Sequence, residues 1–165
     1  MEVIKTLPAV FEEFSEQRRN SFLHAYEIKE KNIPFVGTFC TYTPNEVIMA
    51  AGAIPVGLCS FSDETIAEAE QDLPRNLCPL VKSSYGFAKT QKCPYFYFSD
   101  LIIGETTCDG KKKMYEMLGE IKDTHIMELP NRQSPMGRKL WREEVVALKN
   151  KLEEQKKDGK PTIRI

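Results

Sequence analysis

The amino-acid sequence predicts an α/β fold, with helices covering both faces of a mostly parallel sheet. Short apolar runs alternate along the chain with longer segments of helical periodicity. Such alternation favours parallel strands, because a chain that returns to the same edge of a sheet needs a crossover, usually a helix. There is no internal repeat and no low-complexity linker. We therefore expect residues 1–165 to form a single three-layer domain.

The amino-terminal third is predicted to contain a helix, a strand and a second helix. Residues 8–31 place apolar side chains at three- and four-residue spacing, which is typical of a helix. The run IPFVGTF, residues 33–39, has the composition of a buried strand. The segment TPNE that follows matches a capping box, with Thr43 as the N-cap residue and Glu46 as the third helical residue. This second helix should end at Gly52.

The remaining elements continue the alternation. They are a strand over residues 53–59, a short acidic helix between Ser62 and Pro74, a helix over 79–89, a strand over 101–105, a helix over 111–121, a strand over 125–129 and a helix over 135–157. The last helix has one apolar face, formed by Trp141, Val145, Leu148 and Leu152. We expect this face to pack on the chain's own sheet, and pairing with another molecule is the alternative.

Composition excludes several function classes. The net charge is −1 with both signs interspersed, which argues against a nucleic-acid-binding face. The one basic run, residues 111–113, is interpreted as a solvated first turn of a helix. No stretch approaches the roughly 20 apolar residues that a membrane span needs. The first residues contain acids and no apolar core, unlike a secretory signal, so we expect a cytoplasmic protein.

The five cysteines are the residues most suggestive of chemistry. An odd number in a reducing compartment argues against a disulfide framework. Cys40 and Cys108 each follow a predicted strand and precede a helix, where ligands bind in open α/β sheets. Cys78 precedes the helix that begins at Pro79, and Cys93 lies in a loop before another proline. The fifth, Cys59, closes an apolar run and is interpreted as a packing residue.

Four thiols at junctions suggest a soft metal site. A zinc ribbon fits poorly because no C-x-x-C pair is present. Thiolates without histidine partners suit iron–sulfur clusters. From spacing alone, a redox thiol or a cysteine nucleophile stays open, although no Cys–His pairing that would activate a nucleophile is evident.

Three segments resemble one protein family. GTFCTYTPNEVIMAAGAIPVGLC, LPRNLCPLVKSSYGFAKTQKCPYFYFSDLIIGETTCDGKKKMYE and HIMELPN are similar to the amino-terminal half of the 2-hydroxyacyl-CoA dehydratase D-component family. This family includes 2-hydroxyglutaryl-CoA dehydratase and relatives of benzoyl-CoA reductase subunits, and the resemblance is greatest to its double-cubane-cluster reductase branch. It extends over essentially the whole chain, and CDGKKKMYE is the most specific segment.

The resemblance implies a Rossmann-like domain that contributes to an iron–sulfur site, either [4Fe-4S] or double cubane. The cysteines that match the family's motifs are Cys40, Cys78, Cys93 and Cys108. Glu46 is a candidate polar group near the cluster, although the capping box is the preferred interpretation. The implied function is to pass low-potential electrons from an ATP-hydrolysing activator protein to a substrate, in an anaerobic reductase or a dehydratase. ATP hydrolysis would belong to the activator, because the chain has no phosphate-binding glycine loop.

Members of the family are about twice as long as this chain. We therefore expect a second domain, absent here, to supply further cysteine ligands, either as a carboxy-terminal domain or as a partner subunit. The chain alone would then have an incomplete cluster site and no activity, and we expect it to form a homodimer. The alternative function is a non-catalytic α/β interaction module with no bound cluster.

Overall fold

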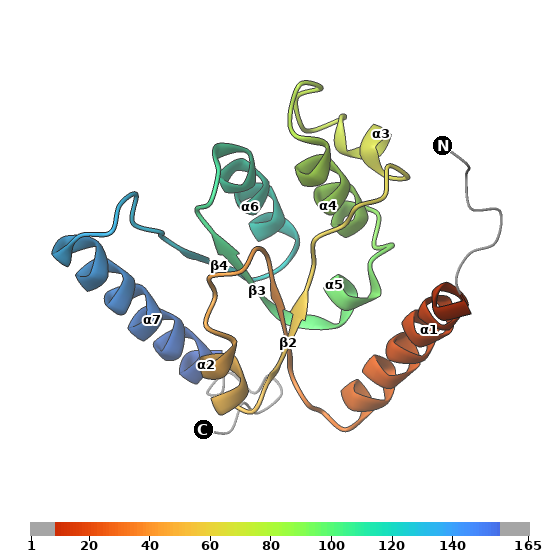
Figure 1. Cartoon of the computed structure of the whole chain (residues 1–165), viewed down its shortest axis with the longest axis horizontal. Helices are drawn as coiled ribbons and strands as arrows, with labels where there is room; N and C mark the ends of the chain where they lie inside the picture. Colours follow the sequence, from red (N-terminus) through yellow and green to blue (C-terminus); the bar gives the residue numbers. More distant parts are fainter. Residues whose placement is uncertain (1–8, 156–165) are drawn as a thin grey trace.

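The computed structural model describes residues 9–155, which form a four-stranded, all-parallel sheet in the order β2-β1-β3-β4 (Figure 1). The strands are β1 (Phe35–Thr38), β2 (Ile54–Gly57), β3 (Ser99–Glu105) and β4 (Thr124–Met127). β1 pairs with both β2 and β3, and β4 extends the sheet beyond β3. The predicted parallel α/β fold is confirmed.

Seven helices within residues 9–155 connect or flank these strands. They are α1 (Ala9–Glu30), α2 (Asn45–Ala50), α3 (Ile66–Ala69), α4 (Pro79–Lys89), α5 (Pro94–Phe98), α6 (Asp109–Ile121) and α7 (Pro135–Gln155). The predicted ends of the first and last helices, residue 8 and residues 156–157, lie outside the described residues. In the described part of the chain, no helix is sufficiently long and apolar to cross a membrane.

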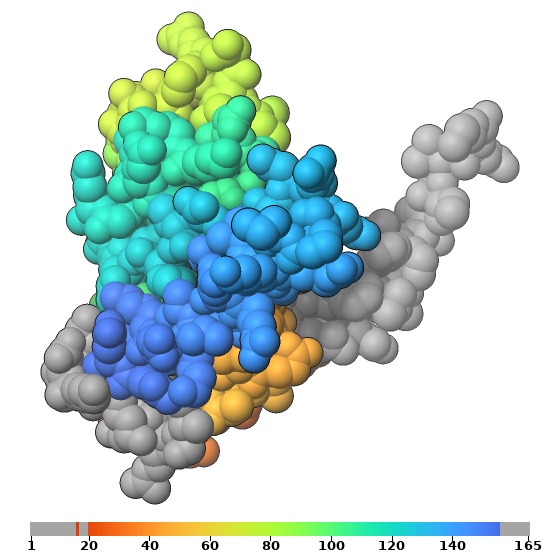
Figure 2. Space-filling view, turned by 90° about the vertical axis from the view of Figure 1, so that its left-hand side faces the viewer, coloured from red at the N-terminus to blue at the C-terminus, as the bar shows by residue number. Residues whose placement is uncertain are grey.

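Two apolar clusters cover the two faces of the sheet, because successive side chains of a strand point to opposite faces. On one face, Ile102 of β3 lies in a cluster with residues of α3, α4, α5 and α6. On the other face, Leu101 and Ile103 pack with α2 and α7. Figure 2 shows α7, in blue, lying between the teal surface of α6 and the orange surface of α2.

The apolar face of α7 belongs to the second cluster. Leu148 and Leu152 are fully buried, and Trp141 and Val145 pack against the same group. The expectation that this face packs on the chain's own sheet is therefore confirmed. Since the face is occupied, it does not provide the pairing surface that the alternative interpretation required.

Two local predictions differ from the structure. The aromatic run at residues 94–98 forms the short helix α5, which was not predicted. Pro94 occupies its first position, where the missing N–H removes no helical hydrogen bond. The predicted capping box is wrong, because the N-cap residue of α2 is Pro44 and no side chain caps the helix. Thr43 instead donates hydrogen bonds from its backbone N–H and its hydroxyl to the buried carboxylate of Glu105.

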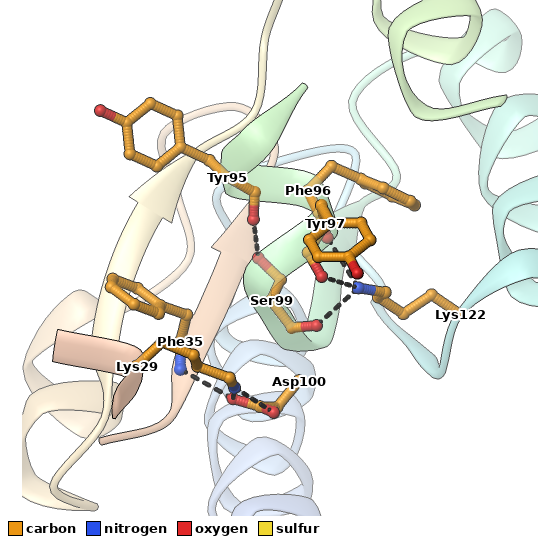
Figure 3. A network of polar contacts seen from close by, with 8 residues as sticks. All are labelled: Lys29, Phe35, Tyr95, Phe96, Tyr97, Ser99, Asp100 and Lys122. Atoms are coloured by element: carbon orange, nitrogen blue, oxygen red, sulfur yellow. Dashed lines mark hydrogen bonds and ion pairs between the residues drawn. The ribbon is translucent and has the colours of Figure 1, made fainter. Parts of the chain in front are cut away.

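The amino end of the sheet is held by a polar network (Figure 3). Asp100 accepts hydrogen bonds from the Lys29 ammonium, at 2.5 and 2.6 Å, and from the backbone N–H of Phe35 at 2.9 Å. Lys122 donates to the carbonyl oxygens of three residues, Phe96, Tyr97 and Ser99, at 2.7 to 2.8 Å. These bonds fix α1, α5 and α6 to the start of β1 and β3.

Candidate functional site

Three cysteines follow the carboxyl ends of neighbouring strands. Cys40 comes two residues after β1, Cys59 two residues after β2, and Cys108 three residues after β3. The carboxyl ends of parallel strands form one edge of the sheet, which is where open α/β folds bind ligands. Cys40 itself has a positive φ of 67°, which for a residue other than glycine marks a tight and costly turn. Two of the predicted site residues, Cys40 and Cys108, are therefore at the expected edge.

Lys111 connects two of these thiols. Its ammonium Nζ lies 2.9 Å from the Sγ atom of Cys40 and 3.5 Å from that of Cys59. It also lies 5.4 Å from the centre of the Phe39 ring, within the range of a cation–π contact. The hydroxyl of Thr107 is 3.2 Å from the same Cys40 Sγ atom. Cys40 and Cys59 thus share one cation, although they are 19 residues apart in the sequence.

The charge of Lys111 is maintained in a buried position. Lys111 is only 5% exposed, whereas Lys112 and Lys113 are exposed. Burial alone would lower the pKa of Lys111, but the hydrogen bond that its ammonium donates to Cys40 and the charges of Cys40 and Cys59 outweigh burial, so the pKa is raised. The interpretation of residues 111–113 as a solvated turn is therefore wrong for Lys111. Its spacing from Met114, Tyr115 and Leu118, all buried, places it on the inner face of α6.

Glu105 is a second buried charged group at this edge. Its residue is fully buried, and its Oε1 atom accepts hydrogen bonds from the backbone N–H and the hydroxyl of Thr43. Its Oε2 atom is buried without a hydrogen-bond partner, as is the Tyr115 hydroxyl. Burial, with the nearby charges of Cys40 and Glu105, raises the pKa of Tyr115. The Oε2 atom of Glu105 therefore has bonding capacity that the described chain leaves unused.

Cys78 and Cys108 begin the two helices that pack side by side on this edge. Each is exposed and is the N-cap residue of its helix, α4 or α6, and neither forms a side-chain cap. The two helix starts are close, since a Cβ atom built on Gly110 would lie 3.0 Å from a methyl group of Leu77. The unpaired N–H groups and dipole of a helix start favour an anionic thiolate.

Cys93 lies elsewhere. It is the N-cap residue of α5, which leads into the start of β3, so it belongs to the amino end of the sheet. Its sulfur accepts a hydrogen bond from the N–H of Phe96 at 3.4 Å and packs against the core. Burial raises the pKa of this thiol. The structure does not bring Cys93 together with Cys40.

Cys59 and Glu46 are the two remaining candidates. Cys59 packs against the core, as predicted, in addition to its contact with Lys111. Glu46 is exposed on α2 and takes no part in a helix cap.

Within residues 9–155, no three His, Cys, Asp or Glu side chains are close enough together to hold a metal ion. The donor set is nevertheless the soft, thiolate-rich one that iron–sulfur clusters use.

A groove of about 540 Å³ opens beside Cys40. Thr107, which contacts the Cys40 sulfur, is part of its wall, and Tyr42 and Trp141 supply aromatic rings. A second groove of about 670 Å³ shares Trp141 and the loop after β4, and it is lined by Arg132, Arg138 and Arg142. Sequence reasoning missed these grooves, because they depend on how α7 begins beside the β4 loop.

Comparison with known proteins identifies the family of the chain. The family model described as 2-hydroxyglutaryl-CoA dehydratase, D-component, matches residues 40–158. An Escherichia coli (strain K12) protein named "Putative dehydratase subunit YjiM" is 60% identical over 156 residues, which is 94% of this chain and 41% of that relative. The chain thus spans less than half the length of the relative. It belongs to the 2-hydroxyglutaryl-CoA dehydratase D-component family.

Proposed function

We propose that this chain supplies thiolate ligands to an iron–sulfur cluster in an ATP-dependent anaerobic reductase or 2-hydroxyacyl-CoA dehydratase-like system. The observation that supports this most is the gathering of cysteines at the carboxyl edge, where Lys111 provides a buried positive charge. Cys40, Cys78 and Cys108 are the proposed ligands at this edge. Cys93 stays a prediction from the family resemblance, and its position at the amino end of the sheet does not favour it.

Each of the surrounding groups has a definable part in such a site. Lys111 balances negative charge beside Cys40, and its hydrogen bond to that sulfur withdraws electron density from the ligand. Thr107 contacts the same sulfur from the wall of the groove, so a molecule held in the groove would lie next to Cys40. Phe39 and Tyr115, whose rings are 5.8 Å apart, exclude water from the inner side.

A bound cluster would accept a low-potential electron from an ATP-hydrolysing activator protein and pass it to the substrate. The second domain or partner subunit, the activator and a homodimeric assembly are parts of this proposal. So is a cytoplasmic location, where thiols are kept reduced. Substrates of the dehydratase or reductase type would occupy the groove beside Cys40.

Anaerobic reconstitution with iron and sulfide tests the proposal. The chain, and in parallel a form extended to the length of the E. coli relative, should take up iron and develop broad visible absorption. Cys40→Ala and Cys78→Ala should remove most of that absorption, since each deletes a ligand. Cys93→Ala is the matched control and should retain it. Absence of iron uptake by both forms would contradict the proposed function.

A further inference from the structure

We propose that Cys59 is a further thiol ligand of the site at the carboxyl edge, paired with Cys40. This inference rests on the proposed function and changes its ligand set, because Cys59 takes the place that Cys93 was expected to fill. Neither the family motifs nor the sequence pattern assigned Cys59 to the site. Its position relative to Cys40 and Lys111 does.

The register of the sheet gives the two thiols equivalent positions. Thr38 of β1 pairs with Gly57 of β2, and the backbone N–H of Leu58 donates to the Thr38 carbonyl at 3.0 Å. Cys40 and Cys59 each come two residues after this pair. Neighbouring strands lie about 4.8 Å apart, so equal offsets place the two cysteines side by side at the edge.

The position of Lys111 shows that both sulfurs face the same point. Its ammonium is 2.9 Å from Cys40 Sγ and 3.5 Å from Cys59 Sγ, so one atom lies within hydrogen-bond reach of both. The two sulfurs are therefore within reach of a single small inorganic centre. Cys93 has no such neighbour, and its sulfur is occupied by the N–H of Phe96.

The environment of Lys111 indicates that this point suits a cation. Two lysines are buried among the described residues, and lysines are rarely buried without a partner. Lys82 is paired with the carboxylate of Glu70 at 2.7 Å, in the ordinary way. Lys111 has the two sulfurs instead of a carboxylate. The ammonium thus lies within reach of both sulfurs, where it would balance the negative charge of two thiolates that bind a metal centre.

Cadmium titration provides the test, because Cd²⁺ binds thiolates without redox chemistry. The reduced full chain, with the exposed Cys78 and Cys108 changed to Ser, is titrated anaerobically with Cd²⁺ and followed by sulfur-to-metal charge-transfer absorption. Cys59→Ser added to this background should weaken Cd²⁺ binding by about tenfold or more, since it deletes one of two ligands. Cys93→Ser is the matched control, a half-buried cysteine at the other end of the sheet, and should leave the affinity unchanged.

The outcomes separate this inference from the proposed function. Weaker binding in the Cys93→Ser variant, equal binding in all variants, or no charge-transfer band in the background would overturn the role of Cys59. If Cd²⁺ binding depends on Cys59 but reconstitution gives no iron–sulfur absorption, the thiol pair stands and the cluster function fails. Far-UV circular dichroism of each variant confirms that a loss of binding is not a loss of fold.

Discussion

The polar side chains discussed at the two ends of the sheet differ in how completely they are hydrogen-bonded. At the amino end, Asp100 is bonded by an ammonium and a backbone N–H, and Lys122 donates to three carbonyl oxygens (Figure 3). At the carboxyl end, Glu105 is fully buried with one oxygen unpartnered, and thiols take the place of carboxylates around Lys111. Buried polar groups normally find partners, and exceptions need an explanation. The network drawn in Figure 3 therefore serves stability, and the free oxygen of Glu105 is consistent with the binding role proposed for the carboxyl end.

Replacing a carboxylate by an amide at each end tests this comparison. The larger change in the free energy of unfolding is expected at the amino end. Asp100→Asn removes the negative charge that holds Lys29 and weakens the bond from the Phe35 N–H. We expect a loss of about 2 kcal/mol in the free energy of unfolding, the cost of losing hydrogen bonds to a charged group in a partly buried site. Urea denaturation measures it. Glu116→Gln, which alters an exposed ion pair with Lys113, is the control and should change nothing measurable.

Thiol labelling sharpens the comparison through an effect of intermediate size. The pKa of Cys93 is raised by burial, so at a given pH less of it is thiolate, the form that reacts. We expect iodoacetamide to alkylate Cys93 at least about tenfold more slowly than the exposed Cys78 and Cys108 at pH 7.5. The rate at Cys93 should continue to rise as the pH passes 9. Mass spectrometry of peptides from the folded chain measures each rate, and labelling of Cys93 as fast as Cys108 would contradict its half-buried placement.

The smallest change in the free energy of unfolding is expected at Glu105, where replacement should not destabilise the fold, unlike Asp100→Asn. Within the described residues, no Lys or Arg forms an ion pair with this carboxylate. Glu105→Gln keeps an acceptor for Thr43 and removes an unpaired buried charge, so stability should stay unchanged or rise by about 1 kcal/mol. The same urea experiment measures it. A loss as large as that of Asp100→Asn would show that the carboxyl end is also built for stability.

The fold was predictable because its signals are local. Alternating strands and helices, and the apolar stripe of α7, follow from side-chain periodicity alone. The position of Cys40 and Cys108 at one edge followed from the same pattern. The burial of Lys111 was also accessible, since Met114, Tyr115 and Leu118 recur at helical spacing from it, but a run of three lysines suggested a solvated turn instead.

Other features of the site depend on contacts that periodicity does not encode. The bond between Thr43 and Glu105 joins residues that are 62 positions apart and replaces the predicted helix cap. The contact of Cys59 with Lys111 depends on β2 ending at Gly57 rather than at residue 59. Cys93 was grouped with the other thiols because it lies in a loop, but its loop leads into the start of a strand.

The loop that holds Cys40 is tied to β3 on both sides. Before Cys40, the N–H of Phe39 bonds to the Ile103 carbonyl at 3.1 Å, and after it Thr43 bonds to Glu105. Only three residues lie between these two ties, so the sulfur has little freedom to move when charge arrives or leaves. A preorganised frame of this kind keeps the reorganisation that accompanies a change of charge small. Under the proposed function, this short tether would favour rapid electron exchange at a cluster bound to Cys40.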